Sequence, residues 1–168
     1  MSNNSATYGG GAINNYGTLT ITNSTLTGNS ADSPYNPYVS GGGINNFGTL
    51  NLNRTIISGN SADVGAEVFN MGTVNANNNN VIGYSGSARS SGFSPGPNDI
   101  IPPGPLDTVL DTALADNDGP TLTHALVSGS LAIDAAPSDA CLAPPINGID
   151  QRGYVRNVDG NGAPSPNE

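Results

Sequence analysis

Lysine and tryptophan are missing from this sequence of 168 residues, and charged side chains occupy only 10% of its positions. Thirteen acidic residues against four arginines give a formal net charge of −9. Proteins that bind nucleic acids need a basic surface to neutralise phosphates, so this balance argues strongly against such a partner. It also argues against a polybasic patch for anionic membranes.

Long apolar runs are also missing. No run approaches the ~18 residues that a membrane-spanning helix needs, so we predict no transmembrane segment. The chain opens with Met1-Ser2-Asn3-Asn4-Ser5 and shows neither the basic start nor the apolar stretch of a signal peptide. The single cysteine, Cys141, cannot form an internal disulfide and does not indicate a redox compartment.

Glycine, asparagine and threonine are abundant where most soluble proteins use lysine, glutamate and alanine. These residues disfavour long helices and favour short strands joined by many turns. The composition therefore predicts an all-β fold.

The first half of the chain repeats itself. Residues 9–31 read GGGAINNYGTLTITNSTLTGNSA, and residues 41–62 read GGGINNFGTLNLNRTIISGNSA. Equivalent positions are 31 residues apart, and a third, weaker copy lies 24 residues further on, with residues 32–40 inserted as a loop. The matched positions are Ile13/Ile44/Val68, Asn15/Asn46/Asn70, Tyr16/Phe47/Met71, Leu19/Leu50/Val74, Ile21/Leu52/Ala76 and Leu26/Ile57/Val81.

Within each copy, apolar and polar residues alternate with a period of two, as in Thr18-Leu19-Thr20-Ile21-Thr22. A strand-only repeat of ~22–24 residues with no room for a helix is typical of a β-solenoid coil. We therefore predict a short parallel β-helix of about three to five coils. Asn15, Asn46 and Asn70 should form a hydrogen-bonded ladder at a bend, and Tyr16 should stack on Phe47.

Two phrases resemble known families. The repeats resemble the parallel β-helix repeats of bacterial surface proteins, including the polymorphic outer-membrane proteins. Residues 119–153, from Gly119-Pro120-Thr121-Leu122-Thr123-His124 to Asp150-Gln151-Arg152-Gly153, resemble the carboxy-terminal part of the choice-of-anchor Q family of exported proteins. The resemblance implies a right-handed, pectate-lyase-like β-helix and export to the cell surface or medium, but no activity.

The same resemblance predicts how the chain is divided. We expect β-helix coils over residues 1–83, a loop-rich last coil or linker over 84–118, and a carboxy-terminal cap over 119–168. The chain ends where the family continues into a further strand, so we expect the cap to be truncated and Cys141 to have lost its partner cysteine.

Enzymes built on parallel β-helices use carboxylates on adjacent coils, with a cation beside them. Asp32 and Asp63 both follow the phrase Asn-Ser-Ala one repeat apart, and Arg54 is the arginine of these coils. These three residues are the catalytic candidates if the protein is a polysaccharide lyase or glycoside hydrolase. The favoured interpretation is that both aspartates lie in solvated turns.

Calcium is the only cofactor that the sequence leads us to consider. Asp116 and Asp118, and further on Asp159 and Asn161, lie in short turns rich in aspartate, asparagine and glycine. Turns without metal are favoured, because neither turn has EF-hand spacing. His124, the one histidine, has no second histidine or cysteine to complete a transition-metal site, and we expect it to be packed in the cap.

Two surface features suggest ligands. Tyr35 and Tyr38, in the inserted loop, are candidates for stacking on sugar rings. The row of Thr18, Thr20 and Thr22 resembles an ice-binding array, but only its first column stays threonine in the other copies.

The predicted function is a non-catalytic structural or adhesive module of an exported or cell-surface protein, with a polysaccharide or cell-surface partner. The alternative is a polysaccharide lyase or hydrolase, or its remnant, and a weaker one is ice binding. The amino-terminal coil has no evident cap, so we also expect self-association through this open β-helix end.

Overall fold

The computed structural model describes residues 1–33, 40–84, 90–144 and 146–156. The chain forms two compact units, Met1–Pro105 and Leu106–Glu168. Each unit is described separately below.

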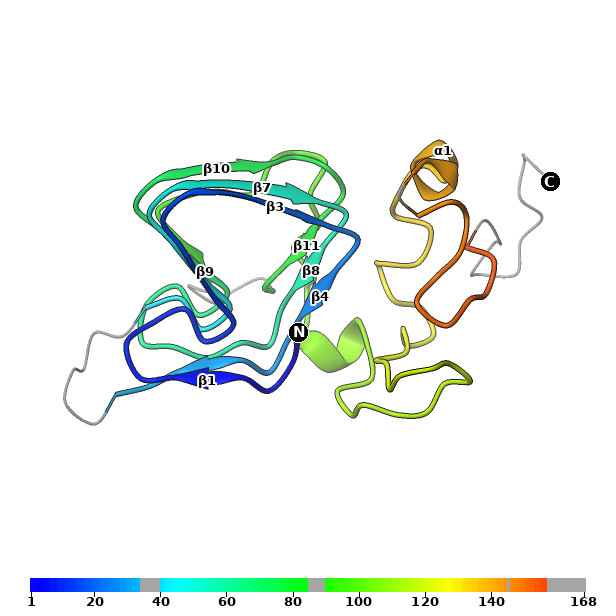
Figure 1. The fold of residues 1–168 in the computed structure, drawn as a ribbon, viewed down its shortest axis with the longest axis horizontal. Coiled ribbons are helices and arrows are strands. Elements are labelled where there is room, and N and C mark those ends of the chain that lie inside the picture. Colours follow the sequence, from blue (N-terminus) through cyan, green and yellow to red (C-terminus); the bar gives the residue numbers. More distant parts are fainter. Residues whose placement is uncertain (34–39, 85–89, 145, 157–168) are drawn as a thin grey trace. The chain divides into compact units, whose positions relative to one another are not determined.

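Unit 1 consists of short parallel strands that coil around a common core and stack into sheets (Figure 1). The described strands form sheets in the orders β1-β5, β2-β6-β9-β12, β3-β7-β10 and β4-β8-β11. This arrangement confirms an all-β, solenoid-like fold. The strands are β1 Ser5–Ala6, β2 Ile13–Asn15, β3 Thr18–Thr22, β4 Thr25–Leu26, β5 Ser30–Ala31, β6 Ile44–Asn46, β7 Thr49–Asn53, β8 Ile56–Ile57, β9 Val68–Asn70, β10 Thr73–Ala76, β11 Val81–Ile82 and β12 Ser90–Ser91.

The strand register follows the sequence repeat with one exception. Ile13 lies beside Ile44, and Ile44 lies beside Val68, as the repeat predicts. The prediction that Val81 aligns with Ile57 is wrong, because Val81 pairs with Ile56 and Ile82 pairs with Ile57.

The shift arises at the corner after β10. Ala76 still pairs with Leu52, but the next contact is from Asn78 Nδ2 to Asn53 Oδ1, 2.6 Å away. Asn77 is therefore an extra residue in the third coil. It moves the following strand by one position and brings Ile82 into the core.

The interior of unit 1 is filled by the apolar residues of each strand. The core cluster consists of Ile21, Leu26, Ile44, Leu50, Leu52, Ile57, Val68 and Ile82. The backbones approach closely at one corner, where a Cβ on Gly48 would collide with the backbone of Gly17, and one on Gly72 with the carbonyl of Gly48. Glycine at Gly48 and Gly72 thus lets successive coils stack at this bend.

The predicted asparagine ladder is confirmed. Asn15 Nδ2 donates to Asn46 Oδ1, and Asn46 Nδ2 donates to Asn70 Oδ1, each over 2.6 Å. Asn70 Nδ2 donates to the carbonyl of Gly92 in the next layer. The three side chains are buried, so the ladder satisfies amides that would otherwise be costly inside the coil.

Unit 2 has few regular elements among its described residues. It contains the 3₁₀ turn η1, Leu106–Thr108, and the short helix α1, Ser138–Leu142. Isolated antiparallel bridges join Leu110 to Leu126 and Ala115 to Thr123. No helix in the described part of the chain combines the length and apolar character required to cross a membrane.

Candidate functional site: the outer face of the central sheet

The candidate site is the outer face of the sheet β3-β7-β10, which we call the amide face. Alternation along the strands turns Leu50 and Leu52 inward and leaves the residues between them at the surface. The amide face consists of Thr18, Thr20, Thr22, Thr49, Asn51, Asn53, Thr73 and Asn75. None of these side chains carries a charge.

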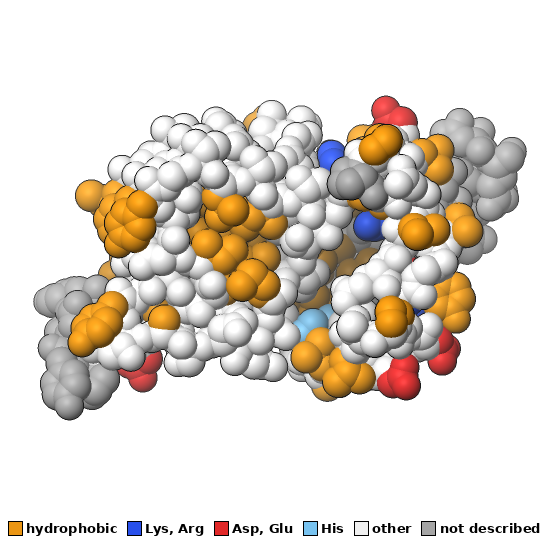
Figure 2. All heavy atoms as spheres, viewed as in Figure 1, with side chains coloured by type: hydrophobic (Ala, Val, Ile, Leu, Met, Phe, Trp, Pro, Cys, Tyr) orange, Lys and Arg blue, Asp and Glu red, His pale blue; other side chains and the backbone are white. Residues whose placement is uncertain are grey.

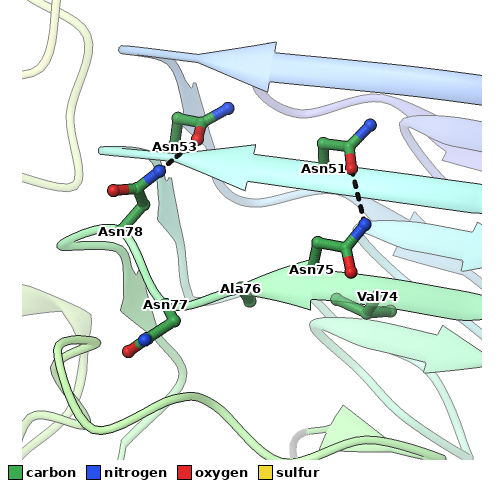
Figure 3. Close-up of a pocket in the computed structure, with 7 residues that line it drawn as sticks. All are labelled: Asn51, Asn53, Val74, Asn75, Ala76, Asn77 and Asn78. Carbon is green, nitrogen blue, oxygen red and sulfur yellow. Dashed lines mark hydrogen bonds between the residues drawn. The ribbon is translucent and has the colours of Figure 1, made fainter.

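Hydrogen bonds between strands align the side chains of this face. Asn75 Nδ2 donates to Asn51 Oδ1 over 2.7 Å, and Asn51 Nδ2 donates to Thr20 Oγ1 over 3.2 Å (Figure 3). A carboxamide has two N–H donors and two acceptor lone pairs, so the ladder leaves part of each group's capacity unused. The face therefore presents ordered donors and acceptors to solvent.

A shallow hollow of about 400 Å³ lies at the end of this face where β7 and β10 finish. Its lining is rich in amides, including Asn53, Asn75, Asn77 and Asn78 (Figure 3). The extra residue Asn77 lies in this lining, and its Oδ1 accepts the backbone N–H of Asn98. The residue that shifts the register thus also contributes to the hollow.

Exposed apolar side chains border the other end of the amide face. The rings of Tyr16 and Phe47 stack with centroids 5.1 Å apart and planes at 3°, as the repeat predicts. Met71 occupies the same position in the third coil, and all three side chains are exposed. Figure 2 shows hydrophobic side chains gathered at the corner where these strands begin. We call Tyr16, Phe47 and Met71 the corner column.

Arg54, a catalytic candidate, lies at the corner between β7 and β8. Its backbone has a φ of 51°, close to the values of 49° at Asn23 and 56° at Asn79 in the neighbouring coils. Its Nε donates to Asn23 Oδ1 over 3.1 Å. Arg54 therefore occupies a stacked left-handed corner, held by a hydrogen bond to the preceding coil.

The two aspartates of the proposed pair lie elsewhere on the coil. Asp32 directly follows β5, and its exposed residue donates its backbone N–H to the carbonyl of Ala6. Asp63 is exposed two residues after Ser61, which bridges to Ser30. The two aspartates thus follow paired positions on successive coils, whereas Arg54 lies at the β7–β8 corner.

The calcium candidates are described only in part. Asp116 and Asp118 are exposed, and Asp116 Oδ1 accepts the backbone N–H of Asp118 over 3.2 Å. Asp159 and Asn161 lie outside the described residues, as do Tyr35 and Tyr38. Within the described ranges, three or more histidine, cysteine, aspartate or glutamate side chains nowhere gather as a metal site would require.

Two carboxylates that the sequence analysis did not single out end buried asparagine ladders. Asn4, Asn29 and Asn60 form a second ladder, and Asn60 Nδ2 donates to Glu67 Oε2 over 2.6 Å. At a third bend, Asn80 Nδ2 donates to Asp99 Oδ1 over 2.8 Å. These acids accept hydrogen bonds where a further asparagine would otherwise be needed.

Unit 2 holds an ion pair at one of its turns. Arg152 Nη2 lies 2.7 Å from Asp150 Oδ2, and the Arg152 guanidinium also lies over the ring of Tyr154. Burial raises the pKa of Asp150 slightly, but hydrogen bonds from the Arg152 side chain and from the backbone of Tyr154 and Arg152 outweigh it and lower the pKa. His124 Nδ1 lies 2.8 Å from the carbonyl oxygen of Asp111.

Comparison of the chain with protein-family models, with curated proteins and with solved structures finds no match.

Proposed function

We propose that the chain is a non-catalytic module of an exported or cell-surface protein that binds glycans on its amide face. The proposal includes the right-handed sense of the β-helix and the relationship to exported β-helix proteins that the sequence phrases imply. The single observation that carries it is the hydrogen-bonded row of Thr20, Asn51 and Asn75 on an uncharged, exposed sheet.

Sugar hydroxyls are recognised by groups that donate and accept hydrogen bonds in fixed positions, and aromatic rings contact the apolar faces of sugars. The amide face supplies the first kind of group, because inter-strand hydrogen bonds hold its carboxamides in place. The corner column supplies the second kind at the border of the same sheet. Preorganised groups lose less conformational entropy on binding.

Affinity electrophoresis against a panel of neutral and acidic polysaccharides tests the proposal. We expect retardation by at least one uncharged polysaccharide, and loss of at least tenfold in affinity in the double variant Asn51→Ala/Asn75→Ala. Tyr16→Ala should weaken binding less, because it leaves the amides intact. Asn14→Ala is the matched control, since Asn14 is an exposed asparagine on β2, in another sheet.

An absence of retardation by every polysaccharide, or equal binding by the double variant and the Asn14→Ala control, would contradict a glycan site on this face.

The enzymatic alternative is a polysaccharide lyase or hydrolase that uses Asp32, Asp63 and Arg54. A depolymerisation assay on the same polysaccharides, with calcium present, separates the two functions. We expect no released oligosaccharides or unsaturated products. Products that disappear in Asp63→Asn would establish the enzyme instead.

A further inference from the structure

The amino-terminal end of unit 1 is stepped. Residues 1–6 form half a coil over the second half of the first complete coil, where Thr27 N donates to the Met1 carbonyl and Ser30 N donates to the Asn4 carbonyl. Over the first half of that coil, β2 and β3 have no described strand on their outer side. One layer of the solenoid is therefore half filled.

The hydrogen-bonding groups of β3 show what this free edge offers. Gly17 O accepts from Thr49 N, and Asn23 N donates to Asn53 O, so the odd-numbered residues face β7. Because successive residues alternate, the backbone groups of Thr18, Thr20 and Thr22 point to the other side. Within the described residues no acceptor pairs with these three N–H groups.

The same half of the first coil leaves part of its core uncovered. Ile13 and Leu19 are only half-buried, whereas Ile44 and Leu50, at the same positions one coil later, are 0% exposed. A further layer over β2 and β3 would bury this apolar area and thereby stabilise the end of the solenoid.

Charge is absent from this end of the sequence. Residues 1–31 contain no aspartate, glutamate, lysine or arginine, so all seventeen charged side chains, thirteen acidic and four basic, follow from Asp32 onward. Exposed strand edges are usually protected by charge or proline, and this edge has neither. Two copies that each carry a net charge of −9 repel least where they meet through this uncharged coil.

We propose that the stepped end binds a second copy of this chain and forms a closed, two-fold dimer. Each copy places its own residues 1–6 over the free β2–β3 edge of the other, so two half-filled layers make one full layer. A two-fold axis across the stack makes the strands antiparallel at the interface, and each contact occurs twice. The dimer is independent of any glycan on the amide face.

Sedimentation equilibrium of the 168-residue chain tests this dimer. We expect a concentration-dependent monomer–dimer equilibrium that ends at the dimer. Thr20→Pro removes one outward N–H and no bond to β7, which an edge strand tolerates, and should weaken the dimer at least tenfold. Thr20→Val is the matched control, because it removes the hydroxyl but keeps the N–H and should leave the dimer within twofold of the parent.

A second variant tests the other half of the interface. Asn4 O and Ala6 O face β5, so Ser5 points its backbone outward from the step. Ser5→Pro should weaken the dimer as Thr20→Pro does, and circular dichroism and melting temperature show whether each variant keeps the fold. A parent chain that stays monomeric, dimers of equal strength in both proline variants, or open-ended growth beyond the dimer would overturn the proposal.

Discussion

Asn60 and Glu67 are joined inside the coil by a hydrogen bond of 2.6 Å from the amide nitrogen to Oε2. Oε2 also accepts the backbone N–H of Asn60, and Oε1 accepts that of Gly59. Glu67 follows Ala66 and precedes Val68, so it stands where Gly43 stands one coil earlier. A fully buried acid therefore completes a ladder that the repeat itself leaves unfinished.

Glu67→Gln should destabilise unit 1 by about 1–3 kcal/mol, because the new amide nitrogen cannot accept an N–H and leaves one buried donor unsatisfied. Chemical denaturation measures this free energy of unfolding. Asp63→Asn is the control, since it makes the same charge change at an exposed position and should alter stability by less than about 0.5 kcal/mol. Equal effects of the two substitutions would mean that the ladder does not depend on the acid.

Gly48→Ala should destabilise unit 1 far more than Gly17→Ala. A Cβ on Gly48 meets the backbone of Gly17, whereas a Cβ on Gly17 meets nothing within 4 Å. We expect a cost above about 2 kcal/mol at Gly48 and less than about 1 kcal/mol at Gly17. Thermal melting of the pair is sufficient, and a similar loss in both variants would contradict the close approach of these coils.

Asn46→Ala removes the middle of the first buried ladder. Asn15 Nδ2 loses the acceptor Asn46 Oδ1, and Asn70 Oδ1 loses the donor Asn46 Nδ2. We expect a loss of about 2–4 kcal/mol in the free energy of unfolding, because the buried partners stay unsatisfied. The exposed Asn14→Ala should be close to neutral in the same measurement, and a comparable loss there would contradict a special role for the ladder.

The ion pair of unit 2 predicts a dependence on acid. The pKa of Asp150 is lowered in the folded state from its ordinary value of 3.8, so the pair stabilises the fold above that value. This contribution should be lost as the pH falls below 3.8 and through the lower folded pKa. NMR titration should show that Arg152→Gln moves the pKa of Asp150 upward, and an unchanged pKa would exclude the guanidinium as its cause.

Much of unit 1 could be predicted from the sequence, because each coil repeats the same short-range pattern. The pairing of Ile13 with Ile44 and the stacking of Tyr16 on Phe47 follow directly from the spacing of the repeats. The sheet outer face was also visible as polar residues alternating with core residues. What the pattern could not show is how individual amides hydrogen-bond across strands to form an ordered surface.

Other features lay outside what a repeat can reveal. The role of Glu67 depends on Asn60 seven residues earlier, although an acid in place of a repeated glycine was an available signal. The one-residue shift at Asn77 could not be found from an alignment without gaps. Unit 2 has no periodic pattern, and its turns depend on specific contacts such as that of Gln151 with Thr121.

The extra residue Asn77 has a consequence for how chains of this kind diverge. The corner absorbs the added residue, the next strand moves by one position, and another apolar residue takes the place in the core. Coils can therefore lengthen or shorten at their corners while the interior stays filled. Descendants of one ancestral solenoid can keep the same architecture after insertions have erased the constant spacing by which their common origin would be detected.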